Sequence, residues 1–168
     1  EEEEEEEEGP PKHKVELSEE AENKVGSILE EYLCIHDTDE AVQCVLEMHE
    51  AGHSKESVNE EIVRKGLLLA LEAGDKESEL MGKMFKVLLE KAVLTMEGSS
   101  KGFCDVLAEL PDITIDIPHA PGLMASIMSG LLEAGLLSKD IVRDGLNTLA
   151  SDSPGTAKHF DDVANLVN

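Results

Sequence analysis

The chain has 168 residues, 40% of them hydrophobic, and this length suits one domain with a substantial apolar core. Acidic residues outnumber basic ones by 38 to 14, the formal net charge is -24, and aromatic residues make up 2% of the chain. Nucleic acids are bound by clusters of Lys and Arg and by aromatic rings that stack on bases, so this composition argues against direct nucleic-acid binding and favours a cationic partner.

The sequence also bears on membranes and on the redox compartment. No stretch approaches the roughly 18 apolar residues of a membrane span, and the start lacks a basic and apolar signal region, so no membrane partner is expected. Cys34, Cys44 and Cys104 are odd in number, lack CxxC spacing and mostly fall within apolar helical patterns. They are interpreted as reduced thiols in or near the core, which predicts an intracellular, cytoplasmic protein.

Residues 1–17 are predicted to be an acidic, disordered linker, because Glu1 to Glu8 form an unbroken run of like charge. Helical periodicity starts at Ser18, a suitable N-cap for a first helix. Thr38 is expected to cap a second helix, which stops near Ala51-Gly52, where glycine can adopt the left-handed conformation. The apolar face of the first helix consists of Val25, Ile28, Leu29, Tyr32 and Leu33.

The third helix is expected to begin at Ser54 or at Ser57, which has capping-box spacing to Glu60, and to end at Ala73-Gly74. Asp75 is expected to cap a fourth helix. That helix should end before Gly98-Ser99-Ser100, from which a fifth helix departs. The apolar positions of the fifth helix are Phe103, Val106, Leu107 and Leu110.

The segment from Pro111 to Pro121 contains three prolines, which predicts a stiff connector that continues neither neighbouring helix. It carries Asp112 and Asp116 beside Ile115 and Ile117, and so could offer a partner both charge and apolar surface at a small ordering cost. The alternative is an ordinary surface loop, in which Asp116 or His119 caps the next helix and Pro121 occupies its first turn.

A sixth helix should end at Ala134-Gly135, and Ser138 should open a seventh. The predicted fold is therefore all-α, with about seven helices in residues 18–150 stacked as antiparallel pairs in an atypical HEAT-like arrangement. Residues 151–168 are expected to be a weakly ordered tail that allows one last turn at 160–167.

The sequence His49-Glu50-Ala51-Gly52-His53 matches the H-E-x-x-H motif of zinc metalloproteases, in which both histidines lie on one helix. Gly52 and the expected helix start at Ser54 argue that the spacing is broken in space. No nucleophile elbow or phosphate-binding glycine loop is present. An enzyme is therefore the less favoured class, and no cofactor or metal is predicted.

Two segments carry a resemblance to a known family. The first runs from Glu30-Glu31-Tyr32-Leu33 through Asp37 to Glu40-Ala41-Val42-Gln43-Cys44-Val45, and the second is Asp116-Ile117-Pro118-His119. Together they resemble the MA-3 domain of the eukaryotic translation initiation factor 4G family, over about Ser18 to Leu149. The resemblance implies a non-catalytic HEAT-repeat module that binds the DEAD-box RNA helicase initiation factor 4A.

The resemblance also implies which residues bind. The related MA-3 domains of programmed cell death protein 4 use an acidic L-x-x-D-x-P-type loop against the helicase's N-terminal RecA-like domain. Asp116 and Pro118 match that aspartate and proline, and Asp112 matches the earlier acidic position. The partner-binding residues expected here are thus Asp112, Ile115, Asp116, Ile117 and Pro118, with either isoleucine as the apolar anchor.

The same resemblance leaves two functions open, because activating scaffolds and inhibitors of this helicase both use the module. Gln43-Cys44 and its surroundings favour the scaffold of the translation initiation complex. The middle HEAT domain and the cap-protein-binding region of the scaffold family are not present in these residues, so recruitment of ribosomes is not assigned to them.

Overall fold

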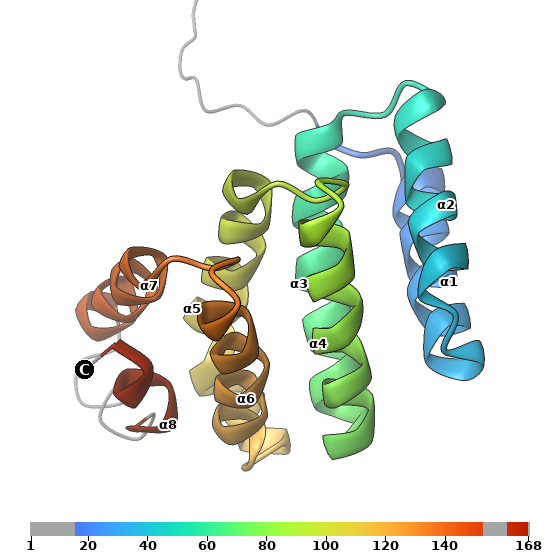
Figure 1. Cartoon of the computed structure of the whole chain (residues 1–168). Helices are drawn as coiled ribbons and strands as arrows, with labels where there is room; N and C mark the ends of the chain where they lie inside the picture. Colours follow the sequence, from blue (N-terminus) through green and yellow to red (C-terminus); the bar gives the residue numbers. More distant parts are fainter. Residues whose placement is uncertain (1–15, 153–160, 168) are drawn as a thin grey trace, which may run out of the picture.

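The computed structural model describes residues 16–152 and 161–167, so most of the acidic segment predicted for residues 1–17 lies outside it. The described residues are helical apart from turns (Figure 1). The elements are α1 (Glu19–Ile35), α2 (Thr38–Glu50), α3 (Lys55–Ala73), α4 (Asp75–Glu90), α5 (Met96–Asp116), α6 (Ala120–Glu133), α7 (Lys139–Asp152), α8 (Asp161–Ala164) and the 3-10 turn η4 (Asn165–Val167).

The helices form antiparallel pairs that stack in two layers (Figure 1). Helices α1, α3, α5 and α7 neighbour one another in one layer, and α2, α4, α6 and α8 neighbour one another in the second. The all-α prediction of about seven stacked helices is therefore confirmed. No described helix is both long enough and apolar enough to cross a membrane.

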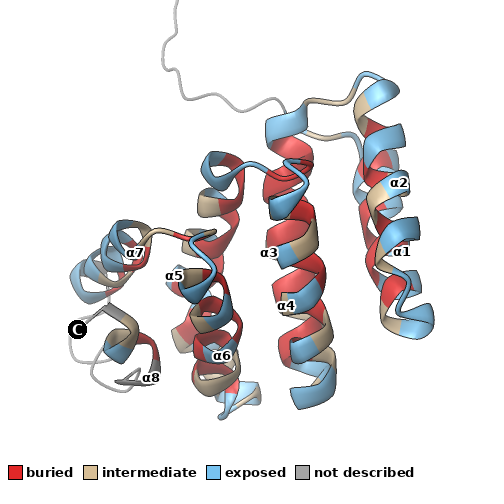
Figure 2. Ribbon diagram, viewed as in Figure 1, coloured by how far each residue is buried: buried red, intermediate tan, exposed pale blue. Residues whose placement is uncertain are grey.

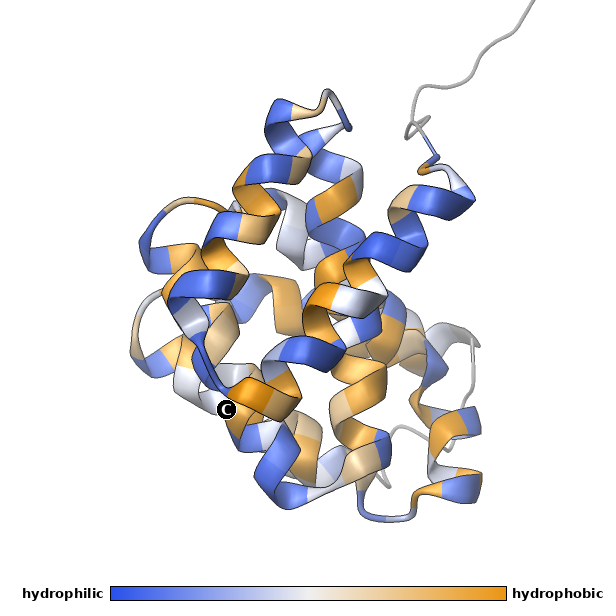
Figure 3. Cartoon of the chain, turned by 90° about the vertical axis from the view of Figure 1, so that its right-hand side faces the viewer, coloured by the Kyte–Doolittle hydropathy of each residue, from blue (hydrophilic) through white to orange (hydrophobic). Residues whose placement is uncertain are grey.

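The core runs between the two layers and is continuous along the stack (Figure 2). The helices carry both hydrophobic and hydrophilic positions along their length (Figure 3). Phe85 of α4 and Phe103 of α5 meet edge to face, with ring centroids 6.1 Å apart. The largest fully buried side chains come mainly from α3, α4 and α5, and include Ile62, Leu67, Leu71, Met81, Met84, Leu88, Leu107 and Leu110.

Several predicted helix ends are confirmed. Ser18 caps α1, since its hydroxyl accepts the Ala21 N–H at 3.1 Å. Ser54 caps α3 by accepting the Ser57 N–H at 3.3 Å, which decides between the two expected starts. The three Ala-Gly stops all place glycine in the left-handed region that other residues rarely adopt, with φ of 98° at Gly52, 126° at Gly74 and 74° at Gly135.

Two predicted caps are wrong by one residue. Thr38 is the first residue of α2, and the cap is Asp37, whose carboxylate accepts the Glu40 N–H at 3.0 Å. Asp75 is likewise the first residue of α4 rather than its cap, and Gly74 holds the N-cap position without a side-chain hydrogen bond. Carboxylates suit either position, because both face the positive end of the helix dipole.

The larger error concerns α5, which the sequence predicted to stop before Pro111. The helix continues through Pro111 to Asp116, so only residues 117–119 connect it to α6. The helix also starts earlier than expected, at Met96. His119 occupies the N-cap position of α6 without a side-chain hydrogen bond, and Pro121 lies in the first turn of α6 as predicted.

Packing explains why α5 tolerates Pro111. A proline inside a helix removes one hydrogen bond and costs roughly 3 kcal/mol. Leu110 is fully buried beside it, and Ile113 packs against the core one turn later, so this turn keeps its contacts only if it stays helical. The Thr114 hydroxyl also donates to the Leu110 carbonyl at 2.9 Å. The helix ends where Ile117, directly before Pro118, takes φ -126° and ψ 82°.

The C-terminal residues contribute to the core. Helix α7 extends to Asp152, and residues 153–160 of the tail expected at residues 151–168 lie outside the described residues. The short α8 and η4 then pack on α6 and α7, and Val163 is fully buried. The last turn expected within residues 160–167 therefore belongs to the packed helical body.

A close approach between α3 and α5 predicts that two glycine substitutions have opposite effects on stability. A Cβ at Gly102 of α5 would lie 2.7 Å from the Val63 Cβ and 2.9 Å from the Glu60 carbonyl oxygen on α3, whereas one at Gly130 of α6 would meet nothing within 4 Å. We expect Gly102→Ala to destabilise the protein by about 1 to 3 kcal/mol through overpacking. Gly130→Ala should stabilise it by about 0.5 to 1 kcal/mol.

Urea unfolding followed by circular dichroism measures both changes. Equal effects of the two substitutions would show that the α3–α5 contact is looser than described.

Candidate partner-binding surface

The helical geometry of α5 places three of the five predicted binding residues on one face. Asp112, Ile115 and Asp116 are spaced i, i+3 and i+4, and all three are exposed. Ile115 is 76% exposed, which is exceptional for a large apolar side chain in this chain. The sequence grouped these two carboxylates and this isoleucine on a loop, whereas the structure places them on the last turns of a helix.

The other two predicted residues behave differently. Ile117 is half-buried and packs against the core, so a partner reaches Ile115 more readily than Ile117. Pro118 is exposed and follows directly on the end of α5. We call Asp112, Ile115, Asp116 and Pro118 the α5 patch.

The carboxylates of the α5 patch destabilise the helix that carries them. The C-terminal end of a helix carries partial negative charge, and a carboxylate there is unfavourable by about 0.3 to 1 kcal/mol. The last turn of α5 contains no basic residue to offset this. Asp112 and Asp116 are also like charges one turn apart, which adds repulsion. Stability of the free helix does not account for this arrangement, which recurs with Glu90 and Glu133 at the ends of α4 and α6, and a cationic partner would relieve it.

The α5 patch lies at one edge of the stack. The turns that join α1 to α2, α3 to α4 and α5 to α6 all lie at the lower edge in Figure 1. Exposed carboxylates accompany each turn, represented by Asp37, Asp75 and Asp116. Asp37 and Asp75 adjoin helix N-termini, where the dipole favours them. The carboxylates of α5, like the exposed Glu72 in the last turn of α3, are opposed by their own helix.

The structure separates the two histidines of the H-E-x-x-H sequence. Helix α2 ends at Glu50, and Gly52 turns the chain so that His53 lies before α3 rather than on α2. The expected break is confirmed, and the two imidazoles do not share a helix face. Burial and the neighbouring Lys55 lower the pKa of His49. No group of three or more metal-ligating side chains occurs among the described residues.

The cysteines are free thiols in the structure, with Cys34 exposed and Cys44 and Cys104 half-buried. Burial raises the pKa of the Cys104 thiol, and neighbouring Asp105 and Asp144 add to this effect. Cys104 also donates a weak hydrogen bond to the Ile141 carbonyl. Cys34 thus departs from the core or near-core position expected for it.

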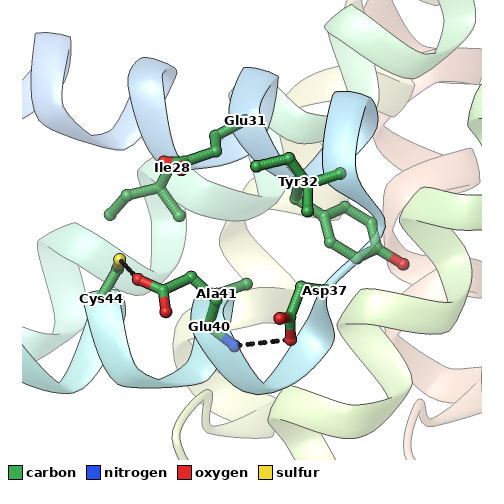
Figure 4. Close-up of a pocket in the computed structure, with 8 residues that line it drawn as sticks. Ile28, Glu31, Tyr32, Asp37, Glu40, Ala41 and Cys44 are labelled. Carbon is green, nitrogen blue, oxygen red and sulfur yellow. Dashed lines mark hydrogen bonds between the residues drawn. The ribbon is translucent and has the colours of Figure 1, made fainter.

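A second surface feature was not foreseen as a site. A pocket of about 210 Å³ opens between α1 and α2, where side chains of the two helices face one another (Figure 4). Its lining includes Glu31, Tyr32, Glu40 and Cys44, which the sequence analysis had named as carriers of the family resemblance but not as a site. The one signal in the sequence that could have indicated this pocket is Ile35, an apolar residue near acidic residues at the end of a helix.

Comparison with known proteins agrees with this architecture. The profile of the MA3 domain family matches residues 21–138, and the chain belongs to this family. The chain is 34% identical to eukaryotic translation initiation factor 4 gamma 3 of Homo sapiens over 126 residues, which are 74% of this chain and 8% of that protein.

Two further relatives are similar over a comparable length. MA3 domain-containing translation regulatory factor 4 of Arabidopsis thaliana is 32% identical over 126 residues, 75% of this chain and 19% of that protein. Programmed cell death protein 4 of Gallus gallus is 30% identical over 119 residues, 70% of this chain and 24% of that protein. The chain therefore spans a quarter or less of each relative, and all three are named as regulatory or initiation factors or as a cell-death protein, not as enzymes.

The unfavourable position of Asp116 predicts that neutralising it stabilises the free protein. Asp116→Asn keeps the size of the side chain and removes a negative charge from the last turn of α5, so the free energy of unfolding should rise by about 0.3 to 1 kcal/mol. Thermal and urea unfolding at low salt measure this change, and high salt should reduce it. A loss of stability in Asp116→Asn would contradict the electrostatic account.

Proposed function

We propose that this MA3 domain is a non-catalytic adaptor module of a translation initiation scaffold, and that it binds the DEAD-box RNA helicase initiation factor 4A. The α5 patch is the proposed contact, and the helicase's N-terminal RecA-like domain is the proposed partner surface. The observation that carries the proposal is the exposed face of Asp112, Ile115 and Asp116 in a chain of the MA3 family.

The chemistry of the α5 patch fits such a partner. A helicase surface that handles RNA phosphates presents Arg and Lys, which pair with carboxylates and steer association over a distance. The carbonyl end of α5 adds to the negative potential there. Ile115 supplies the apolar contact that the centre of a protein interface needs. Binding would leave the helical body unchanged, because the patch lies on a packed helix rather than on a flexible loop.

A second function uses the same contact. The similarity to programmed cell death protein 4, beside that to an initiation factor, supports an MA3-type inhibitor of the same helicase as the alternative. The two functions differ in the sign of the effect. An adaptor should maintain or raise the RNA-dependent ATPase activity of the helicase, and an inhibitor should lower it at saturating concentrations of the domain.

The proposal predicts that Asp116→Ala weakens binding of initiation factor 4A by about 1 to 3 kcal/mol, because a charged contact is lost from the interface. Isothermal titration calorimetry with the purified helicase measures this change, and circular dichroism checks that the helices persist. Affinity of the unchanged domain should also fall as salt concentration rises.

Glu90→Ala is the matched control. Glu90 is likewise an exposed carboxylate at the last residue of a helix, but α4 ends at the opposite edge of the stack (Figure 1). It should therefore leave helicase affinity within about twofold of the unchanged domain. Equal affinity of the Asp116→Ala and Glu90→Ala variants would remove the α5 patch from the interface.

A further inference from the structure

The pocket between α1 and α2 combines an apolar interior with an acidic rim. Ile28 and Ala41 are buried residues that line it from the two facing helices (Figure 4). Tyr32 also lines it, and its hydroxyl is already engaged, since it donates to the Leu80 carbonyl of α4 at 2.9 Å. The interior therefore offers an incoming group chiefly hydrocarbon surface.

Cys44 completes the apolar wall rather than providing a reactive thiol. Its Sγ donates to a carboxylate oxygen of Glu40 at 3.5 Å (Figure 4). Burial raises the pKa of the Cys44 thiol, and both the hydrogen bond and the negative charge of Glu40 raise it further. The thiol consequently stays neutral at physiological pH and has little nucleophilic character.

The rim of the pocket is acidic and partly fixed in place. Glu31, Asp37 and Glu40 line it, and all three are exposed. Asp37 is held by its capping bond to the Glu40 N–H, so part of the rim is ordered before any ligand arrives. Ile35 lies at the same pocket and is 60% exposed, which extends the apolar surface outward.

The charge around this pocket is predominantly negative, although Lys24 lies near enough to act on Cys44. Between Lys24 and Lys55 there is no lysine or arginine, and the acidic residues in that interval are Glu30, Glu31, Asp37, Asp39, Glu40, Glu47 and Glu50. A cationic ligand is favoured there, and an anionic one is disfavoured. The volume of about 210 Å³ is below the range of roughly 300 to 1,000 Å³ usual for small-molecule sites. It suits one inserted side chain better than a cofactor.

We propose that this pocket is a docking site for a short basic segment of a partner protein. One aliphatic side chain of that segment enters between α1 and α2, and flanking Arg or Lys side chains pair with Glu31 and Glu40. Ile35 covers the aliphatic side chain at the mouth. This pocket is separate from the α5 patch, because α1 and α2 form one end of the stack (Figure 1). The docking proposal therefore does not depend on helicase binding.

Fluorescence anisotropy with labelled synthetic peptides tests the proposal on the full chain. The probe peptide carries one leucine flanked on each side by two arginines, and its control carries serine in place of leucine. We expect the leucine peptide to bind at least about fivefold more tightly than the serine peptide, because one buried aliphatic side chain contributes that much or more. Binding of both should weaken as salt concentration rises.

Two pairs of variants locate the binding. Glu31→Gln should weaken the leucine peptide about threefold to tenfold, and Glu30→Gln, the same change at the neighbouring exposed residue outside the pocket, should alter it less than about twofold. Ile35→Ser should reduce the preference for leucine over serine, whereas Leu46→Ser, at another exposed apolar residue outside the pocket, should preserve it.

The outcomes are distinct. Equal affinity for the leucine and serine peptides would overturn the proposal, because it would show that only the arginines of the peptide are attracted to the domain. Equal effects of Glu31→Gln and Glu30→Gln, or no detectable binding at low salt, would overturn it as well. Unchanged binding of initiation factor 4A in the Glu31→Gln variant would support the separation of this pocket from the α5 patch.

Discussion

The close contact between α3 and α5 is the constraint on which the rest of the structure depends. Gly102 brings the two helices so near that a single Cβ would collide with Val63 and with the backbone of α3. This contact sits in the middle of the stack, and α1, α4, α6 and α7 pack around it. It fixes the axis of α5, and therefore the direction in which Asp112, Ile115 and Asp116 face. The proposed binding patch is an end of a core helix.

Much of the fold could be predicted from the sequence because helix ends are specified locally. Ser18 and Ser54 cap their helices, and the glycine of each Ala-Gly stop takes a positive φ. The course of α5 could not be predicted in this way. The cost of Pro111 is visible in the sequence, but the burial of Leu110 and the packing of Ile113 that offset it depend on neighbours distant along the chain.

The same distinction applies to the binding surfaces. The residues of the α5 patch were identifiable, since two carboxylates beside isoleucines and prolines are unusual, yet their arrangement on one face required the helix. The inward position of Ile117 also required the fold. The pocket between α1 and α2 was missed because it forms only when two helices face each other. Both proposed surfaces are acidic with an apolar centre, an arrangement that suits specific contact with a cationic partner.

Hydrogen–deuterium exchange of the domain, free and saturated with initiation factor 4A, tests the central claim most directly. Amides at the end of α5 and in residues 117–119 should become protected in the complex, while those at the α4–α5 turn on the opposite edge should not change. Protection confined to other helices, with the end of α5 exchanging as in the free domain, would contradict it.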